Sequence, residues 1–203
     1  MGQILLFDID GTLFDAEKFG KLTREEFLRI LNIDEENLMR TIADYYSSLE
    51  ASTDYNPREI TVFMGEKYNI DPKLLDKLFW EEDKHYQESL FPETLSVLQQ
   101  LSEKKTLGIF SQGLEDFQLH KLEASGIRDF FNKAFIFVRR RKSLEDATGD
   151  LPKGATVIDN NHQVVLKFSP VVNTIWINRK SQDSDPQIKT IHSLEELITS
   201  AKG

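Results

Sequence analysis

The chain contains no cysteine, no long apolar run and fewer basic than acidic residues. Without cysteine there is no disulfide framework and no thiolate metal site. No segment approaches the roughly 20 apolar residues of a membrane span, and the N-terminus lacks a signal-peptide pattern, so we expect a cytoplasmic protein without a membrane partner. The net charge of −9 argues against broad nucleic-acid binding, which needs a basic surface. No feature indicates an oligomer interface, and we expect a monomer.

What the chain does contain is most informative at its start. Residues 4–7 form a continuous apolar run, which is typical of a buried strand in a parallel sheet. Asp8 and Asp10 follow, and period-two geometry would place them on the same side of an extended chain. Gly11 then permits a tight turn. Two like charges at the end of a buried strand are costly unless a cation or a reaction needs them, so we expect chemistry here.

The rest of the chain divides into two patterns. Residues 15–91 predict an inserted domain of four helices, opening near residues 23, 34, 57 and 72, the last two with a proline in the first turn. From residue 92 helices alternate with strands at 106–110, 134–138, 156–158 and 174–177, and a helix over 193–201 closes the chain. This alternation predicts an α/β fold, with a doubly wound parallel-sheet (Rossmann-like) core built from residues 1–14 and 92–203.

Polar residues follow three of these strands. The first strand leads into Asp8 and Asp10, the strand at 106–110 into Ser111 and Gln112, and the strand at 156–158 into Asp159. Ligands of such sheets bind beyond the carboxyl ends of the strands, where these residues would meet. Each has an ordinary alternative, a solvated turn acid or, for Ser111, a helix cap. Their coincidence at one edge favours a site.

Three short motifs carry a family resemblance. Residues 8–12, Asp-Ile-Asp-Gly-Thr, resemble the first motif of the haloacid dehalogenase (HAD) superfamily, whose commonest members are Mg²⁺-dependent phosphatases. Residues 109–113, a strand ending in serine, resemble its second motif, and residues 157–160 resemble its acidic fourth motif. The helical insertion resembles the type 1 cap of that family. The resemblance covers essentially the whole chain.

The resemblance implies a role for each acid. Asp8 would be the nucleophile that forms an aspartyl-phosphate, and Asp10 would protonate the leaving group and later activate water. Mg²⁺ would be held by Asp8, Asp159 and the backbone carbonyl of Asp10.

The resemblance also implies a phosphate-binding set and a lysine. The phosphoryl oxygens would be held by Ser111 and by the backbone N–H groups of Gly11, Thr12 and Gln112. The lysine of the third motif would be Lys142, about thirty residues beyond Ser111, with Lys153 as the alternative. Phe14, Lys18 and Phe19, which follow the first motif closely, are candidates for substrate contacts.

Two departures from the family pattern leave alternatives open. Asn160 stands where many relatives carry a second acid, and only a turn or two of helix fits after Lys142. We therefore expect a Mg²⁺-dependent phosphomonoester hydrolase acting on a small soluble phosphorylated metabolite. A phosphomutase with the same residues and a catalytically weak binding or regulatory protein remain as alternatives. Haloacid dehalogenation is less favoured, because Asp10 would have little purpose in it.

Overall fold

A computed structural model describes residues 3–199, and its centre is a six-stranded sheet. The strand order is β3-β2-β1-β4-β5-β6, and every neighbouring pair is parallel. The strands are β1 (Ile4–Phe7), β2 (Thr106–Gln112), β3 (Ile136–Arg139), β4 (Thr156–Asp159), β5 (Asn173–Ile177) and β6 (Lys189–Ile191). The predicted parallel α/β fold is confirmed. The short edge strand β6 was not expected from the sequence.

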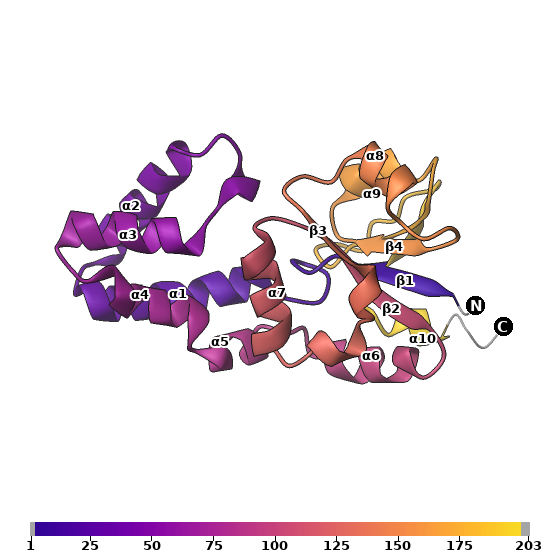
Figure 1. Cartoon of the computed structure of the whole chain (residues 1–203), viewed down its shortest axis with the longest axis horizontal. Helices are drawn as coiled ribbons and strands as arrows, with labels where there is room; N and C mark the ends of the chain where they lie inside the picture. Colours follow the sequence, from indigo (N-terminus) through magenta and orange to yellow (C-terminus); the bar gives the residue numbers. More distant parts are fainter. Residues whose placement is uncertain (1–2, 200–203) are drawn as a thin grey trace.

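Strand β1 lies in the middle of the sheet and is buried on both faces. Its side chains alternate, so Leu5 and Phe7 join one hydrophobic cluster while Leu6 joins a second cluster with Phe110 and Val157. In Figure 1 the helices α8 and α9 lie above the sheet, and α6 and α10 lie below it. Their bounds are α6 (Thr94–Ser102), α8 (Leu144–Gly149), α9 (His162–Phe168) and α10 (Glu196–Thr199). Residues 200 and 201 of the predicted closing helix lie outside the described residues.

Residues 15–91, here called the helical insertion, contain five α-helices rather than the four expected. They are α1 (Ala16–Leu31), α2 (Glu35–Ser47), α3 (Pro57–Tyr68), α4 (Pro72–Trp80) and α5 (Asp83–Glu88). The first starts at Ala16 instead of residue 23, because the Asp15 carboxylate accepts the Lys18 N–H and caps it. The side chains of Asp34, Asn56 and Asp71 cap α2, α3 and α4, so these helices start where they were expected. Within residues 3–199, no helix is long and apolar enough to cross a membrane.

Aromatic packing and ion pairs join the insertion to the sheet domain. Helix α7 (Glu115–Ala124) lies between them in Figure 1, and its Phe117 ring packs against Phe19 of α1 and Phe79 of α4, with centroids 6.4 and 6.0 Å away. At the tip of the insertion, Asp54 of the 3₁₀ turn Ser52–Asp54 forms an ion pair of 3.0 Å with Arg141 of the loop after β3. The insertion therefore packs over the carboxyl edge of the sheet.

Candidate active site

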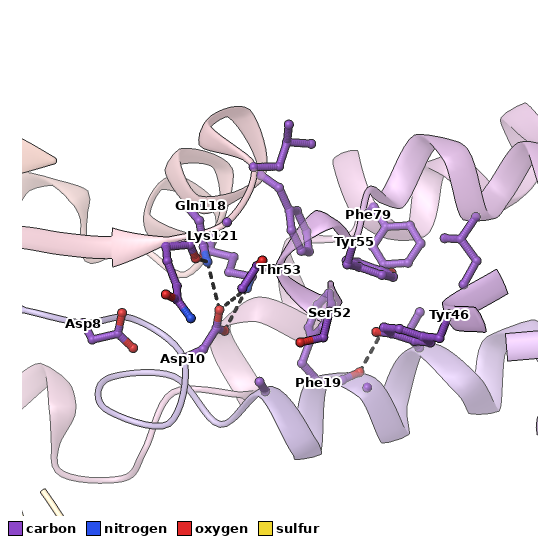
Figure 2. A pocket seen from close by; sticks show the side chains of 18 of the residues that line it. Asp8, Asp10, Phe19, Tyr46, Ser52, Thr53, Tyr55, Phe79, Gln118 and Lys121 are labelled. Atoms are coloured by element: carbon purple, nitrogen blue, oxygen red, sulfur yellow. Dashed lines mark hydrogen bonds and ion pairs between the residues drawn. The ribbon is translucent and has the colours of Figure 1, made fainter. Parts of the chain in front are cut away.

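The turn after β1 separates the two aspartates of the first motif. The strand ends at Phe7, and the Ile9 carbonyl accepts the backbone N–H groups of Thr12, Leu13 and Phe14. The chain therefore bends between Asp8 and Asp10, and the two side chains do not stay on one side of an extended strand as expected. The Asp8 side chain contacts Ser111 at the end of β2 and Lys142 in the loop after β3, whereas Asp10 is directed toward α7 (Figure 2).

Asp8 belongs to a buried cluster that forms where three strands end. Its Oδ1 accepts hydrogen bonds from the Ser111 hydroxyl at 3.0 Å and from Lys142 Nζ at 2.8 Å. Lys142 Nζ also donates to Asp159 Oδ2 at 2.5 Å, and the side chains of Lys142 and Asp159 are each 2% exposed. Asp8 Oδ2 accepts no hydrogen bond from residues 3–199. One carboxylate oxygen is thus fixed by a cation and a hydroxyl, and the other is left for a ligand.

This cluster holds two carboxylates and one cation away from water. Burial raises the pKa of Asp8 to about 6; Lys142 acts against this rise, while Asp159 and Asp10 add to it. Burial alone would lower the pKa of Lys142, but its two carboxylate partners outweigh that effect and raise it. Lys142 stays protonated while Asp8 is hard to ionise. An additional cation would relieve the remaining repulsion between the acids.

The lysine of the third motif was left open between two positions, and the structure distinguishes them geometrically. Lys142 lies in the loop after β3 at the carboxyl edge of the sheet and contacts Asp8 and Asp159. Lys153 is exposed and precedes β4, at the opposite edge. The structure therefore brings Lys142, and not Lys153, to the cluster.

Asp10 is held by two residues of α7 that the sequence did not single out. Both of its carboxylate oxygens lie 2.7–2.8 Å from Lys121 Nζ, and Oδ2 also accepts from Gln118 Nε2 at 2.9 Å (Figure 2). The Lys121 side chain is 7% exposed, and its ammonium lies against the rings of Phe117 and Phe14, 4.5 and 5.6 Å from their centroids. A buried cation with a single carboxylate partner fixes the position of that carboxylate.

The backbone donors expected for phosphate differ from those the turn leaves free. The Gly11 N–H already donates to the Phe14 carbonyl at 2.7 Å, and the Thr12 N–H to the Ile9 carbonyl at 3.3 Å, because both are needed to close the turn. In the described chain, the N–H groups of Ile9 and Asp10 have no acceptor. Within residues 3–199 these two amides are therefore unpaired, whereas those of Gly11 and Thr12 are used by the turn.

The oxygen donors suit a magnesium ion. Asp8, Asp159 and the Asp10 carbonyl were predicted to hold it, and the first two carboxylates share Lys142 as a neighbour. Among residues 3–199 no group of three or more His, Cys, Asp or Glu side chains is arranged to hold a metal. Mg²⁺ does not require such a cage, since it commonly takes one or two carboxylates and keeps several waters. The carboxylates and the raised pKa of Asp8 fit a hard divalent cation.

A cavity of about 460 Å³ opens onto this cluster and continues into the helical insertion. Asp8, Asp10, Gln112 and Lys142 line one end, together with Asn160. The Asn160 amide packs closely against Gly11 in the turn after β1. A Cβ atom on Gly11, whose φ is +77°, would lie only 2.1 Å from Asn160 Nδ2.

The three substrate-contact candidates that follow the first motif lie in different places. Phe19 lines the cavity. Phe14 is instead buried in the hydrophobic core, where it packs against Tyr86. Lys18 donates a hydrogen bond from Nζ to the Glu88 carbonyl at 2.5 Å and does not line the cavity.

An arginine from the C-terminal part of the chain contacts the turn after β1 that carries both aspartates. Arg179, in the loop after β5, donates from Nη2 to the Thr12 carbonyl at 2.8 Å and pairs through Nη1 with Glu93 Oε1 at 2.8 Å. Its guanidinium also stacks over Phe91, 3.7 Å from the ring centroid. The turn that carries both aspartates is therefore anchored to the start of α6.

Comparisons with known proteins identify similar sequences. A family model for haloacid dehalogenase-like hydrolases matches residues 3–150. A glyceraldehyde 3-phosphate phosphatase of Methanothermobacter thermautotrophicus is 32% identical over 149 residues, covering 66% of this chain and 62% of that protein. The match therefore spans less than two thirds of that relative's length.

Two solved structures share the fold over the whole chain. A HAD phosphatase of Thermococcus onnurineus is similar with a TM-score of 0.66 at 22% identity, covering 100% of this chain and 99% of the other. The magnesium-bound HAD-hydrolase YfnB of Bacillus subtilis has a TM-score of 0.67 at 19% identity, with the same coverage of 100% and 99%. At these identities the two structures show the fold alone.

Proposed function

Because the chain belongs to the haloacid dehalogenase-like hydrolases, we propose that it is a Mg²⁺-dependent phosphomonoester hydrolase acting on small phosphorylated metabolites. The observation that carries this proposal is the Asp8 carboxylate. One of its oxygens is fixed by Ser111 and Lys142, and the other is free toward the cavity. A carboxylate held in this way can attack phosphorus.

In this proposal the chain's own residues divide the first step between them. Asp8 Oδ2 attacks phosphorus, the ester oxygen leaves, and an aspartyl-phosphate forms. Lys142, Ser111 and the free amides of Ile9 and Asp10 bind the phosphoryl oxygens. The metal, held by Asp8, Asp159 and the Asp10 carbonyl, would supply positive charge that offsets repulsion between Asp8 and the phosphate.

Asp10 would transfer the protons. It protonates the leaving oxygen in the first step and takes a proton from water in the second, when the aspartyl-phosphate is hydrolysed. In the structure its carboxylate is bound to Lys121 and Gln118, so it must turn from them toward the ester oxygen. Both positions border the same cavity, and the helical insertion, acting as a cap, would exclude bulk water during these steps.

Phosphate release tests this function. A panel of sugar, triose and alkyl phosphates is incubated with the protein in Mg²⁺ and in excess chelator. We expect release that requires Mg²⁺ and is abolished in Asp8→Asn, while Asp129→Asn, an exposed carboxylate-to-amide control, retains it. Unchanged turnover in Asp8→Asn would refute the assignment of Asp8 as the nucleophile. Absence of turnover across the panel, together with no Mg²⁺ binding by calorimetry, would favour the binding-protein alternative.

The relative named above gives the panel a first member. That protein is called a glyceraldehyde 3-phosphate phosphatase, and a triose phosphate is a small phosphate ester of the proposed class. Transfer of the phosphoryl group back to a second hydroxyl of the substrate, rather than to water, would identify the mutase alternative.

A further inference from the structure

The cavity is larger than a phosphate group requires, and its two ends differ in chemistry. Beyond Asp10 and Lys121 it continues between the helices of the insertion, where the labelled side chains in Figure 2 are Phe19, Tyr46, Tyr55 and Phe79. At about 460 Å³ the cavity is in the range that accepts a drug-sized ligand. A phosphate on a three-carbon chain would occupy the end near Asp8 and leave this aromatic end empty.

Part of the aromatic end is open to a ligand in a way that ordinary core packing is not. Tyr46 stacks on Tyr55 with ring centroids 5.8 Å apart and planes 14° from parallel, yet Tyr46 remains 42% exposed. Both rings line the cavity. A flat apolar group placed against them would remove exposed ring surface from water, and stacked aromatic contacts add to that gain.

A narrow polar zone separates the two ends. Ser52 and Thr53 are drawn in Figure 2 between Asp10 and the aromatic residues. Thr53 Oγ1 is buried and, among residues 3–199, has no hydrogen-bond partner. The turn that carries it is fixed, since Asp54 accepts the Ala51 N–H at 3.1 Å and pairs with Arg141. An unpaired buried hydroxyl in a fixed turn is suited to a polar group of a ligand.

Charge narrows the class of ligand further. Arg24 is the only charged residue that the helical insertion contributes to the cavity lining. No carboxylate from the insertion is therefore available to pair with an amine. The far end suits a neutral or anionic group and disfavours a cationic one.

We propose that this cavity selects phosphate monoesters in which a short linker joins the phosphate to a flat, uncharged or anionic aromatic ring. The inference rests on the proposed phosphatase function. The phosphate would lie at Asp8 and Lys142, the linker beside Thr53, and the ring against Tyr46 and Tyr55.

The test compares esters that differ in the ring and little in leaving-group chemistry. Rates with 2-phenylethyl phosphate are measured against ethyl phosphate and glycerol 1-phosphate, all primary alkyl esters, at saturating Mg²⁺. We expect kcat/KM to be at least about tenfold higher for the ring-bearing ester, as apolar contacts of this size produce. Tyr46→Ala should reduce that ratio severalfold. Met39→Ala, an equally exposed apolar residue on the same helix that does not line the cavity, should keep it.

The outcomes separate this proposal from the function it rests on. Equal kcat/KM for all three esters would overturn the aromatic subsite and leave the phosphatase standing, as would a ratio that Tyr46→Ala does not change. If no ester is hydrolysed, the phosphatase fails. Calorimetry of the Mg²⁺-loaded protein then tests whether the aromatic subsite exists. Tighter binding of 2-phenylethyl phosphate than of ethyl phosphate, with the difference lost in Tyr46→Ala, supports the subsite. Equal binding of the two esters overturns it.

Discussion

Replacing the proposed nucleophile should stabilise the protein when no metal is bound. Asp8→Asn removes one of two carboxylates that share Lys142 in a buried cluster, and Lys142 keeps its ion pair with Asp159. The remaining cluster is one cation and one anion, which is neutral. Removing one charge from a buried ion pair normally leaves the opposite charge without a partner. Here Lys142 keeps Asp159 as its partner.

The size of the effect follows from the pKa of Asp8. Burial raises it from 3.8 to about 6, so ionising Asp8 at neutral pH costs folding free energy. At 1.36 kcal/mol per pKa unit this cost is at most about 3 kcal/mol. The substitution also loses the charge-assisted contact to Lys142, which offsets part of this gain, so we expect a net gain of roughly 1–2 kcal/mol in the free energy of unfolding. For a chain of this length that is a rise of several degrees in Tm, at about 2–4 °C per kcal/mol.

The pH dependence has a definite sign. Because the folded pKa of Asp8 lies above its unfolded value, the folded state binds more protons between about pH 4 and 6. Asp8 therefore makes the wild type lose stability as pH rises through that window, and the penalty is complete above it. The difference in the free energy of unfolding between Asp8→Asn and wild type should be largest near pH 8 and should shrink as the pH falls toward 4.

Urea unfolding in excess chelator at several pH values measures this difference. Asp129→Asn provides the control for a carboxylate-to-amide change at an exposed site. Adding Mg²⁺ should stabilise the wild type by RT ln(1 + [Mg²⁺]/Kd) and stabilise Asp8→Asn much less, which reverses the order. If Asp8→Asn is less stable than wild type at pH 8 in chelator, the electrostatic account of the cluster is wrong.

Three further substitutions probe neighbouring contacts. Asp10→Asn should lower the free energy of unfolding by roughly 1–3 kcal/mol in urea titrations, because it leaves the buried Lys121 cation without a carboxylate; equal stability to wild type would contradict that pairing. Lys142→Ala should lower kcat by at least about 100-fold in the phosphate-release assay, whereas Lys153→Ala at an exposed position should keep wild-type rates, and the opposite result would reassign the lysine. Arg179→Lys keeps the charge but loses the fork that joins the Thr12 carbonyl to Glu93, and we expect a loss of about 1–2 kcal/mol by urea unfolding; an unchanged midpoint would show that the fork adds nothing.

The residues that the sequence places at the site are those attached to strand ends. Asp8, Ser111 and Asp159 each follow or finish an apolar run, and a parallel sheet must bring the carboxyl ends of adjacent strands together. The sheet order puts β1 between β2 and β4, so these three side chains are neighbours. No knowledge of side-chain packing is needed for that inference.

The partners of Asp10 depend on packing that no local pattern encodes. Gln118 and Lys121 are three residues apart on α7 and so share one face of the helix. From the sequence that spacing is equally typical of a solvated helix surface. Lys121 is buried because Phe14 from the turn after β1 and Phe117 from α7 itself cover its ammonium group. The free amides of Ile9 and Asp10 were missed for a similar reason, because they depend on which carbonyls the turn uses.

The choice between Lys142 and Lys153 shows how topology alone can decide a residue's place. In a parallel α/β sheet the chain leaves each strand at the carboxyl edge and returns to the next strand at the amino edge. Lys142 follows β3 and precedes Ser143, which caps α8 by accepting the Asp146 N–H. Lys153 follows α8 and precedes β4. A lysine between strand and helix can reach the ends of β1 and β4, whereas one between helix and strand is a strand's length away. The short α8 does not weaken this argument, since the order of elements, and not the length of the helix, determines which edge each lysine occupies.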